Sequence, residues 1–285
     1  MVRSQPRISR KGSRIIEFYQ IIEIGKVNFE FHEAKGENRM KIYALHKDKT
    51  KKLLCLPGLF MNSECFVSLS KYLPEFCVVA VTYDAHDKGT KFISFEQEIK
   101  KIENGLIAKG LDDFDVVLGT SIGAQLAVLL LNRGNIKTDR LILDGLKSYR
   151  IGEKERLSLS VQFYVFMMIS RCNIDFLRCT YSRYWARQMA RCARNMTRES
   201  LRNYVKDFVS FEISEGLPSG TMVLYGGNEK HNQDNIKHLK KVSPNTEINI
   251  KERYGHLNYL DDNPEKYAEM IRGEINMAKE ERRKI

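Results

Sequence analysis

The chain has 285 residues, 42% of them hydrophobic and 29% charged, and its formal net charge is +11. The length fits one large α/β domain, with or without an insertion, and the composition is ordinary for a globular protein. No apolar run reaches the roughly 18 residues of a membrane span. The basic start MVRSQPRISRKGSR lacks the apolar region of a signal peptide, so we expect a cytoplasmic protein.

The first predicted elements are strands. After a basic extension over residues 1–25, the segments VNFEFHE (27–33) and MKIYALH (40–46) alternate apolar and polar residues. This alternation predicts half-buried strands, which we expect to pair as an antiparallel hairpin at a sheet edge. Four apolar runs typical of fully buried strands follow, at residues 51–60, 76–84, 114–119 and 139–145. Helices are predicted between the last three of these runs, at residues 93–110, with Gly110 as C-cap, and from 121 to near Gly134.

This alternation stops at residue 146. Residues 146–216 carry only helical signals, after which strands at 221–227 and 246–252 alternate with helices at 232–242 and 263–283. We therefore predict a mostly parallel central sheet flanked by helices, built from residues 26–145 and 217–285. Residues 146–216 are predicted to form an inserted all-helical cap over the carboxyl ends of the strands, where open α/β sheets bind ligands.

The six cysteines predict neither disulfides nor a metal site. None of them forms a CxxC pair, and in a chain of this length they are interpreted as reduced, mostly buried thiols. The spacings of Cys172, Cys179 and Cys192 do not match those of the usual zinc sites. We expect no metal and no cofactor.

The positive charge is concentrated in the predicted cap. Residues 147–206 hold thirteen Lys and Arg against four Asp and Glu, and six arginines recur at helical spacing: Arg183, Arg187, Arg191, Arg194, Arg198 and Arg202. The plainest interpretation is a solvated helix face. The alternatives are an anionic substrate, an anionic membrane surface or an acidic partner, with membrane contact less expected than a small-molecule acyl substrate. No nucleic-acid-binding motif accompanies the charge, so we expect no nucleic-acid partner.

The stretch FDVVLGTSIGAQLAVLLL carries the main chemical signal. Gly119-Thr120-Ser121-Ile122-Gly123 lies between a predicted buried strand and a predicted helix. Small residues at both glycine positions allow the sharp turn that exposes a nucleophilic serine, and the helix start directs N–H groups at developing negative charge. Without this context the motif would indicate only a small residue in a loop, because it also occurs by chance. In this context Ser121 is predicted to be a nucleophile.

Together with four further segments, this motif resembles the α/β-hydrolase superfamily with a helical cap. The segments are LLCLPGLFMNSECF, VTYDAHDKG, VLYGGNEK and RYGHLNYL, all in the family's order, and the resemblance covers roughly residues 26–283. It implies the chain order nucleophile, acid, histidine. Of the six histidines, His256 lies in the loop after the last strand, where the family keeps its catalytic base.

The catalytic acid is less clearly marked. The family usually carries Asp in a Gly-x-x-Asp turn, and here the matching turn reads Gly226-Gly227-Asn228-Glu229. The resemblance therefore implies Glu229 as the acid. Asp144, which follows another strand, and Asp234 remain alternatives.

The resemblance also implies an oxyanion hole formed by the backbone N–H groups of Leu59 and Ile122. The family's loop often reads His-Gly-x, whereas this chain has Pro57-Gly58-Leu59, which leaves the donor of residue 59 available. In VTYDAHDKG, Asp84 is interpreted as a structural turn anchor, and His86 and Asp87 are candidates to line the pocket.

The expected activity is hydrolysis of a carboxylic ester or thioester, through a Ser121–His256–Glu229 triad and an acyl-enzyme. The substrate is expected to be a small molecule with an acyl group, apolar or anionic. Cleavage of C–C or amide bonds and acyl transfer remain open. So does a non-catalytic, receptor-like protein that has kept the fold.

Overall fold

The computed structural model describes residues 41–283. All of these residues belong to one compact unit. The predicted strand at 27–33 lies outside the described residues, so the hairpin is not tested.

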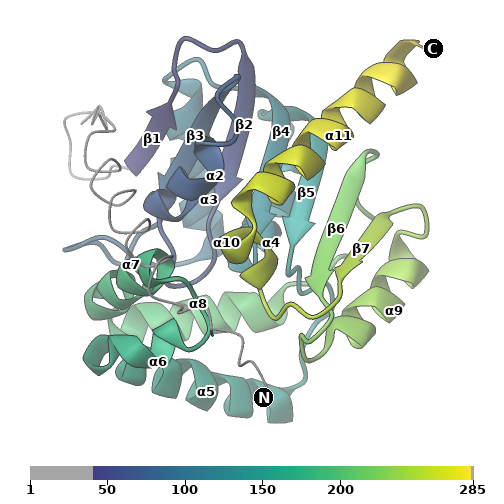
Figure 1. The fold of residues 1–285 in the computed structure, drawn as a ribbon. Helices are drawn as coiled ribbons and strands as arrows, with labels where there is room; N and C mark the ends of the chain where they lie inside the picture. Colours follow the sequence, from purple (N-terminus) through teal and green to yellow (C-terminus); the bar gives the residue numbers. More distant parts are fainter. Residues whose placement is uncertain (1–40, 284–285) are drawn as a thin grey trace, which may run out of the picture. The chain divides into compact units, whose positions relative to one another are not determined.

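Within residues 41–283 the core is a seven-stranded sheet with the order β1-β3-β2-β4-β5-β6-β7 (Figure 1). Its strands are β1 (Lys41–Leu45), β2 (Lys51–Leu56), β3 (Phe76–Thr82), β4 (Asp113–Thr120), β5 (Lys137–Asp144), β6 (Thr221–Gly226) and β7 (Glu247–Lys251). Every neighbouring pair is parallel except β1 with β3, so the predicted mostly parallel sheet is confirmed. β1 pairs antiparallel with β3 and is the outermost strand on that side among residues 41–283.

Helices cover both faces of this sheet. They are α2 (Val67–Ser70), α3 (Phe95–Ile107), α4 (Ile122–Leu131), α9 (Asn232–Val242), α10 (Asn258–Asp262) and α11 (Pro264–Arg283), with a short 3₁₀ helix, η1, at Ser63–Phe66. α11 crosses the sheet in front in Figure 1 and contacts α2, whereas α4 lies behind it and packs with α3. Because both faces are covered, the central strands are almost wholly apolar and buried.

Four helices lie between β5 and β6, and we call them the helical insertion: α5 (Glu153–Cys172), α6 (Ile174–Arg178), α7 (Arg183–Asn195) and α8 (Arg198–Ser210). No strand interrupts them in this described segment. The insertion lies toward the ends at which β5 and β6 finish (Figure 1). The side chains of two N-cap residues stabilise the starts of α7 and α8: the Ser182 hydroxyl accepts the N–H of Trp185, and the Thr197 hydroxyl accepts the N–H of Ser200.

Three short helices, η1, α2 and α10, have no counterpart among the predicted elements. Each spans four or five residues, which is too short for a helical period to be recognised in a sequence. Among the described helices, none is long and apolar enough to cross a membrane.

Candidate active site

Ser121 occupies a strained turn between β4 and α4. Its backbone has φ 56° and ψ −117°, a conformation that costs a non-glycine residue free energy and persists only where the surroundings enforce it. One restraint is visible: the Ser121 N–H donates to the carbonyl of Asp144, at the end of neighbouring β5, over 2.7 Å. The turn therefore places the serine at the carboxyl edge of the sheet.

The two motif glycines are required by close backbone contacts. A Cβ atom on Gly119 would lie 2.5 Å from the carbonyl oxygen of Gly123. One on Gly123 would lie 2.1 Å from the carbonyl oxygen of Leu56, at the end of β2. Both distances are far below van der Waals contact, so α4 approaches β2 and β4 only because neither residue has a side chain.

We expect Gly123→Ala to destabilise the protein, because the new methyl group would push against two rigid backbone segments. The expected cost is about 1–3 kcal/mol, measured as a lower unfolding midpoint. Gly273→Ala is the matched control, since no atom lies within 4 Å of its added Cβ. In the middle of α11 that change should stabilise the protein by about 0.5–1 kcal/mol. Equal midpoints for the two variants would contradict this interpretation of the turn.

His256 and Glu229 form a close pair beside this turn. His256 Nδ1 lies 2.8 Å from Glu229 Oε2, and the other carboxylate oxygen accepts the N–H of Gly226 at 2.7 Å. The carboxylate is thus fixed from both sides in the turn that follows β6. Asn228 and Tyr254 also link the two loops, because the Asn228 N–H donates to the Tyr254 carbonyl.

Gly145 brings the imidazole next to the serine turn. Its φ is 69°, and a Cβ there would lie 2.4 Å from His256 Cε1, so the ring packs directly on the glycine backbone. Gly145 follows Asp144, whose carbonyl accepts the Ser121 N–H. In the described part of the chain the Ser121 hydroxyl and the His256 ring are not hydrogen-bonded. Such pairs are often loose before substrate binds.

The electrostatics of the pair favour a histidine that binds its proton more tightly than usual. Burial lowers the pKa of His256, but the hydrogen bond to Glu229 and the charge of that carboxylate outweigh burial, so the pKa is raised. This is the arrangement expected of a base that must hold a proton during a reaction.

The two alternative acids have other hydrogen-bond partners or none in this region. Asp144 is buried and accepts a hydrogen bond from the Tyr267 hydroxyl at 3.0 Å. Burial, together with the nearby Glu229 carboxylate, raises the pKa of Asp144 to about 7. Asp234 is exposed, and its Oδ2 lies 3.8 Å from His231 Nδ1. Of the three carboxylates, Glu229 is the one hydrogen-bonded to His256.

The loop after β2 supplies a free backbone donor beside the serine. A Cβ on Gly58 would lie 3.2 Å from Ser121 Cβ, which places the loop against the serine turn. Neither the Leu59 N–H nor the Ile122 N–H has a protein acceptor among residues 41–283. Both predicted oxyanion donors are therefore unoccupied N–H groups next to Ser121.

Several solved structures have a fold similar to that of this chain. An α/β-hydrolase family protein from Desulfitobacterium hafniense has a TM-score of 0.66 at 22% identity, covering 82% of this chain and 99% of that one. Carboxylesterase CesB from Bacillus subtilis has a TM-score of 0.65 at 15% identity, covering 92% and 97%. The type II thioesterase BorB from the borrelidin biosynthetic cluster has a TM-score of 0.61 at 15% identity, covering 85% and 100%.

This chain has the α/β-hydrolase fold. No family model matches its sequence, and no curated protein is significantly similar. The likeness therefore lies in the arrangement of strands and helices, as the motif order predicts.

His86, a candidate to line the pocket on the sequence, supports the loop after β2 instead. His86 is buried, and its Nε2 accepts the N–H of Phe60 at 2.8 Å. Nδ1 then carries the ring hydrogen and faces the Asp84 carbonyl at 3.3 Å. Burial lowers the pKa of His86 to about 4, which keeps the ring neutral and Nε2 an acceptor. His86 thus holds the residue that follows Leu59.

Two further residues of the loop after β3, in which His86 lies, have structural partners. Asp84, interpreted as a turn anchor, forms an ion pair with Lys101. Asp87, the second candidate to line the pocket, pairs with Lys41 over 2.6 Å. Among the described residues no group of His, Cys, Asp and Glu has the geometry to hold a metal ion.

A cavity of about 330 Å³ opens beside the His256–Glu229 pair. Its sheet side includes Gly145, Glu229 and His256, and the α5 side includes Ser158, Leu159 and Gln162. Its volume is at the lower end of the range for small-molecule sites. One face of α5 thus forms a wall of the space in front of the imidazole.

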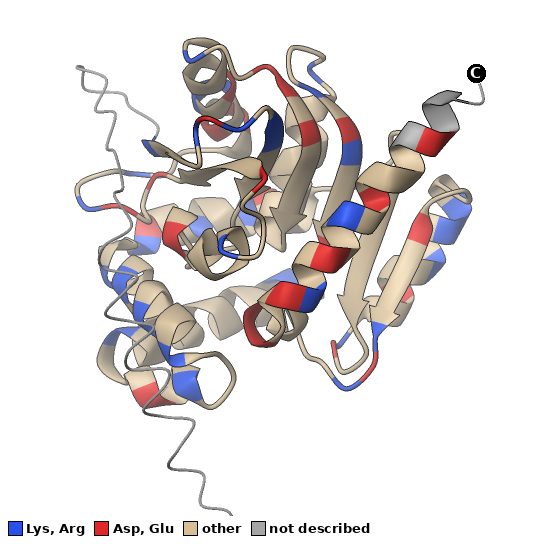
Figure 2. Cartoon of the chain, turned by 45° about the horizontal axis from the view of Figure 1, so that its top comes forward, with Lys and Arg blue, Asp and Glu red and all other residues tan. Residues whose placement is uncertain are grey.

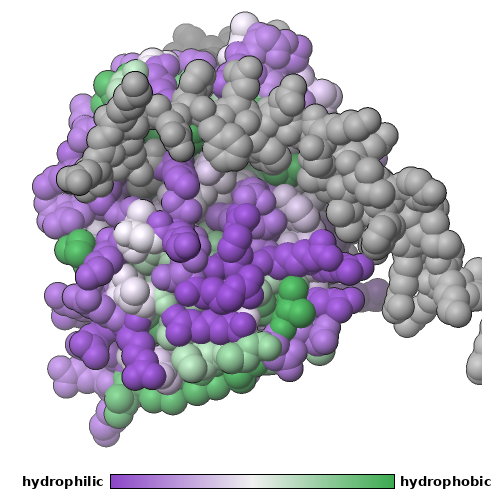
Figure 3. Space-filling view, turned by 90° about the vertical axis from the view of Figure 1, so that its left-hand side faces the viewer, coloured by the Kyte–Doolittle hydropathy of each residue, from purple (hydrophilic) through white to green (hydrophobic). Residues whose placement is uncertain are grey.

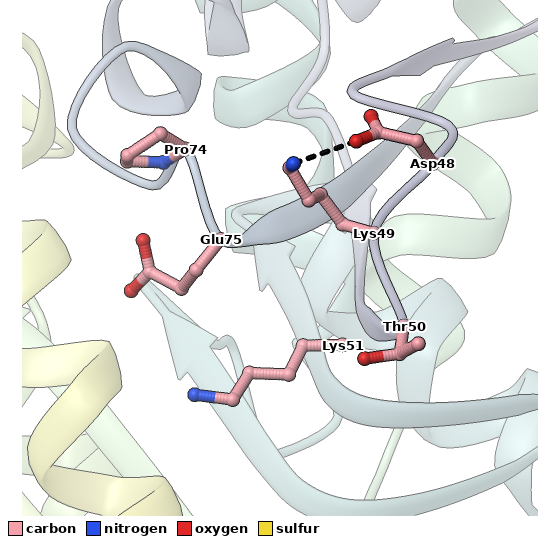
Figure 4. A pocket seen from close by; sticks show the side chains of 6 residues that line it. All are labelled: Asp48, Lys49, Thr50, Lys51, Pro74 and Glu75. Atoms are coloured by element: carbon pink, nitrogen blue, oxygen red, sulfur yellow. Dashed lines mark hydrogen bonds and ion pairs between the residues drawn. The ribbon is translucent and has the colours of Figure 1, made fainter.

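A second hollow lies at the opposite end of β2 (Figure 4). It is lined by Asp48, Lys49, Thr50, Lys51, Pro74 and Glu75. Three of its charged side chains have ionic partners: Lys49 binds Asp48 at 2.6 Å, and Glu75 accepts from Arg272 Nε at 2.6 Å. β2 begins here and reaches the loop beside Ser121 only at its other end, so this hollow is not part of the candidate site.

Proposed function

We propose that the protein is a serine hydrolase that cleaves a carboxylic ester or thioester. The observation that carries the proposal is the 2.8 Å contact between His256 Nδ1 and Glu229 Oε2. The His256 ring packs on Gly145, and the carbonyl of the preceding residue, Asp144, accepts the Ser121 N–H. This arrangement supports Ser121 as nucleophile, His256 as base and Glu229 as acid, which follow one another along the chain in the order typical of this fold.

In the proposed mechanism Ser121 Oγ attacks the substrate carbonyl carbon while His256 Nε2 accepts the hydroxyl proton. Glu229 holds the Nδ1 hydrogen and stabilises the imidazolium that forms. The N–H groups of Leu59 and Ile122 donate to the tetrahedral oxyanion. When the bond to the leaving group breaks, His256 gives its proton to the departing oxygen or sulfur. Water, deprotonated by His256, then hydrolyses the acyl-enzyme and regenerates Ser121.

The cavity beside His256 supports a small acyl or alcohol group as the substrate portion bound there. Its volume is about 330 Å³, and its wall on α5 mixes Leu159 with the polar Ser158 and Gln162. We propose the helical insertion as a cap that closes over this space. Carboxylesterases and a thioesterase among proteins of similar fold agree with an ester or thioester as the bond cleaved.

Labelling with a fluorophosphonate tests the proposal directly, because such probes modify only an activated serine. We expect one modified residue, Ser121, identified by peptide mapping, and competition by short-chain ester substrates. A wild-type protein that is not labelled, or is labelled at another serine, would contradict the mechanism. It would favour a non-catalytic protein that has kept the fold.

His86 gives a further prediction about the oxyanion loop. His86→Leu removes the acceptor for the Phe60 N–H. The loop after β2 should then become more mobile, and the Leu59 N–H should no longer be held in position to donate to the oxyanion. We expect kcat to fall by up to about 10²-fold, with KM changed much less, because the donor acts on the transition state. Asn195→Ala serves as comparison, since it removes only the hydrogen bond to the His86 carbonyl. A loss confined to KM would contradict this role.

A further inference from the structure

Helix α5 presents a row of apolar side chains to solvent on the side away from the cavity. Leu157, Val161 and Val165 are spaced four residues apart, and they are 71%, 54% and 47% exposed. This spacing places them on one face of the helix. Four-residue repeats of exposed aliphatic side chains are costly in water unless something covers them.

Basic side chains flank this apolar row. The Arg198 guanidinium lies 5.3 Å from the Tyr164 ring centre, and Tyr164 is three residues after Val161 on α5. Four further exposed arginines lie on α7 and α8, the two helices that pack against α5: Arg183, Arg187, Arg194 and Arg202. None of these four contacts an acidic side chain within the described residues, in contrast to Arg191, which pairs with Glu64. We call the apolar row and these five arginines the basic-apolar face.

The figures agree with this grouping. Figure 2 shows many Lys and Arg, and few Asp and Glu, on the helices of the insertion. Figure 3 shows a band of hydrophilic residues next to hydrophobic ones along the lower edge of the molecule. Apolar and cationic side chains side by side are the composition of helices that lie in a lipid headgroup region.

We propose that the basic-apolar face docks on an anionic lipid surface. Charge complementarity selects this partner: the arginines bind anionic headgroups, while the three aliphatic side chains enter the acyl boundary. A second copy of the chain fits less well, because symmetric pairing would bring unpaired arginines of both copies into one contact. A purely polyanionic partner would leave the apolar row exposed to water.

Docking would also orient the molecule. The inner face of α5 lines the cavity beside His256, and the outer face carries the apolar row. A membrane against the outer face therefore lies one helix thickness from the candidate site. The docking proposal does not depend on the catalytic assignment and is tested without any substrate.

Cosedimentation of the full chain with vesicles tests the proposal. We expect binding to phosphatidylcholine vesicles that contain phosphatidylglycerol, weaker binding without it, and weakening with salt. L157S/V161S/V165S should reduce the partition constant at least about tenfold. R187Q/R194Q/R198Q should reduce it about 100-fold. The residues before position 41 are the same in every variant, so differences report on this face.

A matched control changes the same charge elsewhere. Lys237, Lys240 and Lys241 are exposed on α9, outside the insertion, and their joint change to Gln should leave binding within about twofold of wild type. Equal losses from this variant and the arginine variant would overturn the proposal, because binding would then follow net charge alone. Loss from the arginine variant without loss from the aliphatic one would indicate a polyanion and would also overturn it.

Tryptophan fluorescence provides a second measurement that does not require the triple variants. The single native tryptophan, Trp185, is buried, so a second one introduced at an exposed position reports separately. Leu157→Trp should show a blue shift when anionic vesicles are added, and Lys241→Trp should not. No shift at position 157, or self-association that depends on the aliphatic row in the absence of vesicle binding, would refute docking on lipid.

Discussion

Ser121→Ala is expected to lower ester turnover by at least about 10³-fold. The change removes the atom that forms the acyl-enzyme and leaves only the oxyanion donors and the binding cavity to act. Folding should be affected little, because alanine replaces serine at the same φ of 56° and Ser121 makes no side-chain cap hydrogen bond. Hydrolysis of a panel of short-chain esters and thioesters, with a thermal midpoint for each protein, provides the measurement.

The control for this variant is Ser210→Ala. Ser210 lies at the end of α8, where its hydroxyl donates to the Lys206 carbonyl, and it is exposed. Turnover of Ser210→Ala should stay within about twofold of wild type, as for most surface changes. Turnover of Ser121→Ala close to that of wild type would show that the ester chemistry uses another nucleophile.

The fold could be predicted largely from local patterns. The apolar run at 51–60 contains β2, and the runs at 114–119 and 139–145 overlap most of β4 and β5, because parallel strands buried on both faces are apolar over most of their length. The helix predicted at 232–242 matches α9 at both ends. The GTSIG turn was also recognisable, because its two glycines meet a steric requirement that any sequence forming the turn must satisfy.

Other features depend on contacts between distant residues and left no local signal. The hydrogen bond from the Phe60 N–H to His86 joins loops after different strands, so the sequence marks His86 only as a polar residue after an apolar run. The choice of Glu229 over Asp144 is of the same kind. Both lie at the carboxyl end of a strand, and the packing of His256 on Gly145 decides which carboxylate the ring meets. The outward row on α5 belongs to a segment in which apolar residues occupy several faces of one helix.

Glu229→Gln is expected to reduce kcat by about 10²–10⁴-fold, because an amide can hold the wrong tautomer of His256 and cannot stabilise the imidazolium. The pH profile should change as well. Catalysis needs neutral His256, so activity rises with pH through the pKa of this residue, which Glu229 raises. Removing the carboxylate should therefore shift the acidic limb of the remaining activity to lower pH.

Asp144→Asn and Asp234→Asn separate this role from a general loss of negative charge. Asp234 is exposed and is not hydrogen-bonded to His256, so its change should leave both kcat and the acidic limb as in wild type. Asp144 accepts the Tyr267 hydroxyl and lies near the imidazole, so its change should affect stability and alter kcat much less than Glu229→Gln does. If Asp144→Asn instead produced the larger loss in kcat and the shift in the acidic limb, Asp144 would be the acid. The 2.8 Å contact of Glu229 with His256 would then describe only the resting arrangement of the ring.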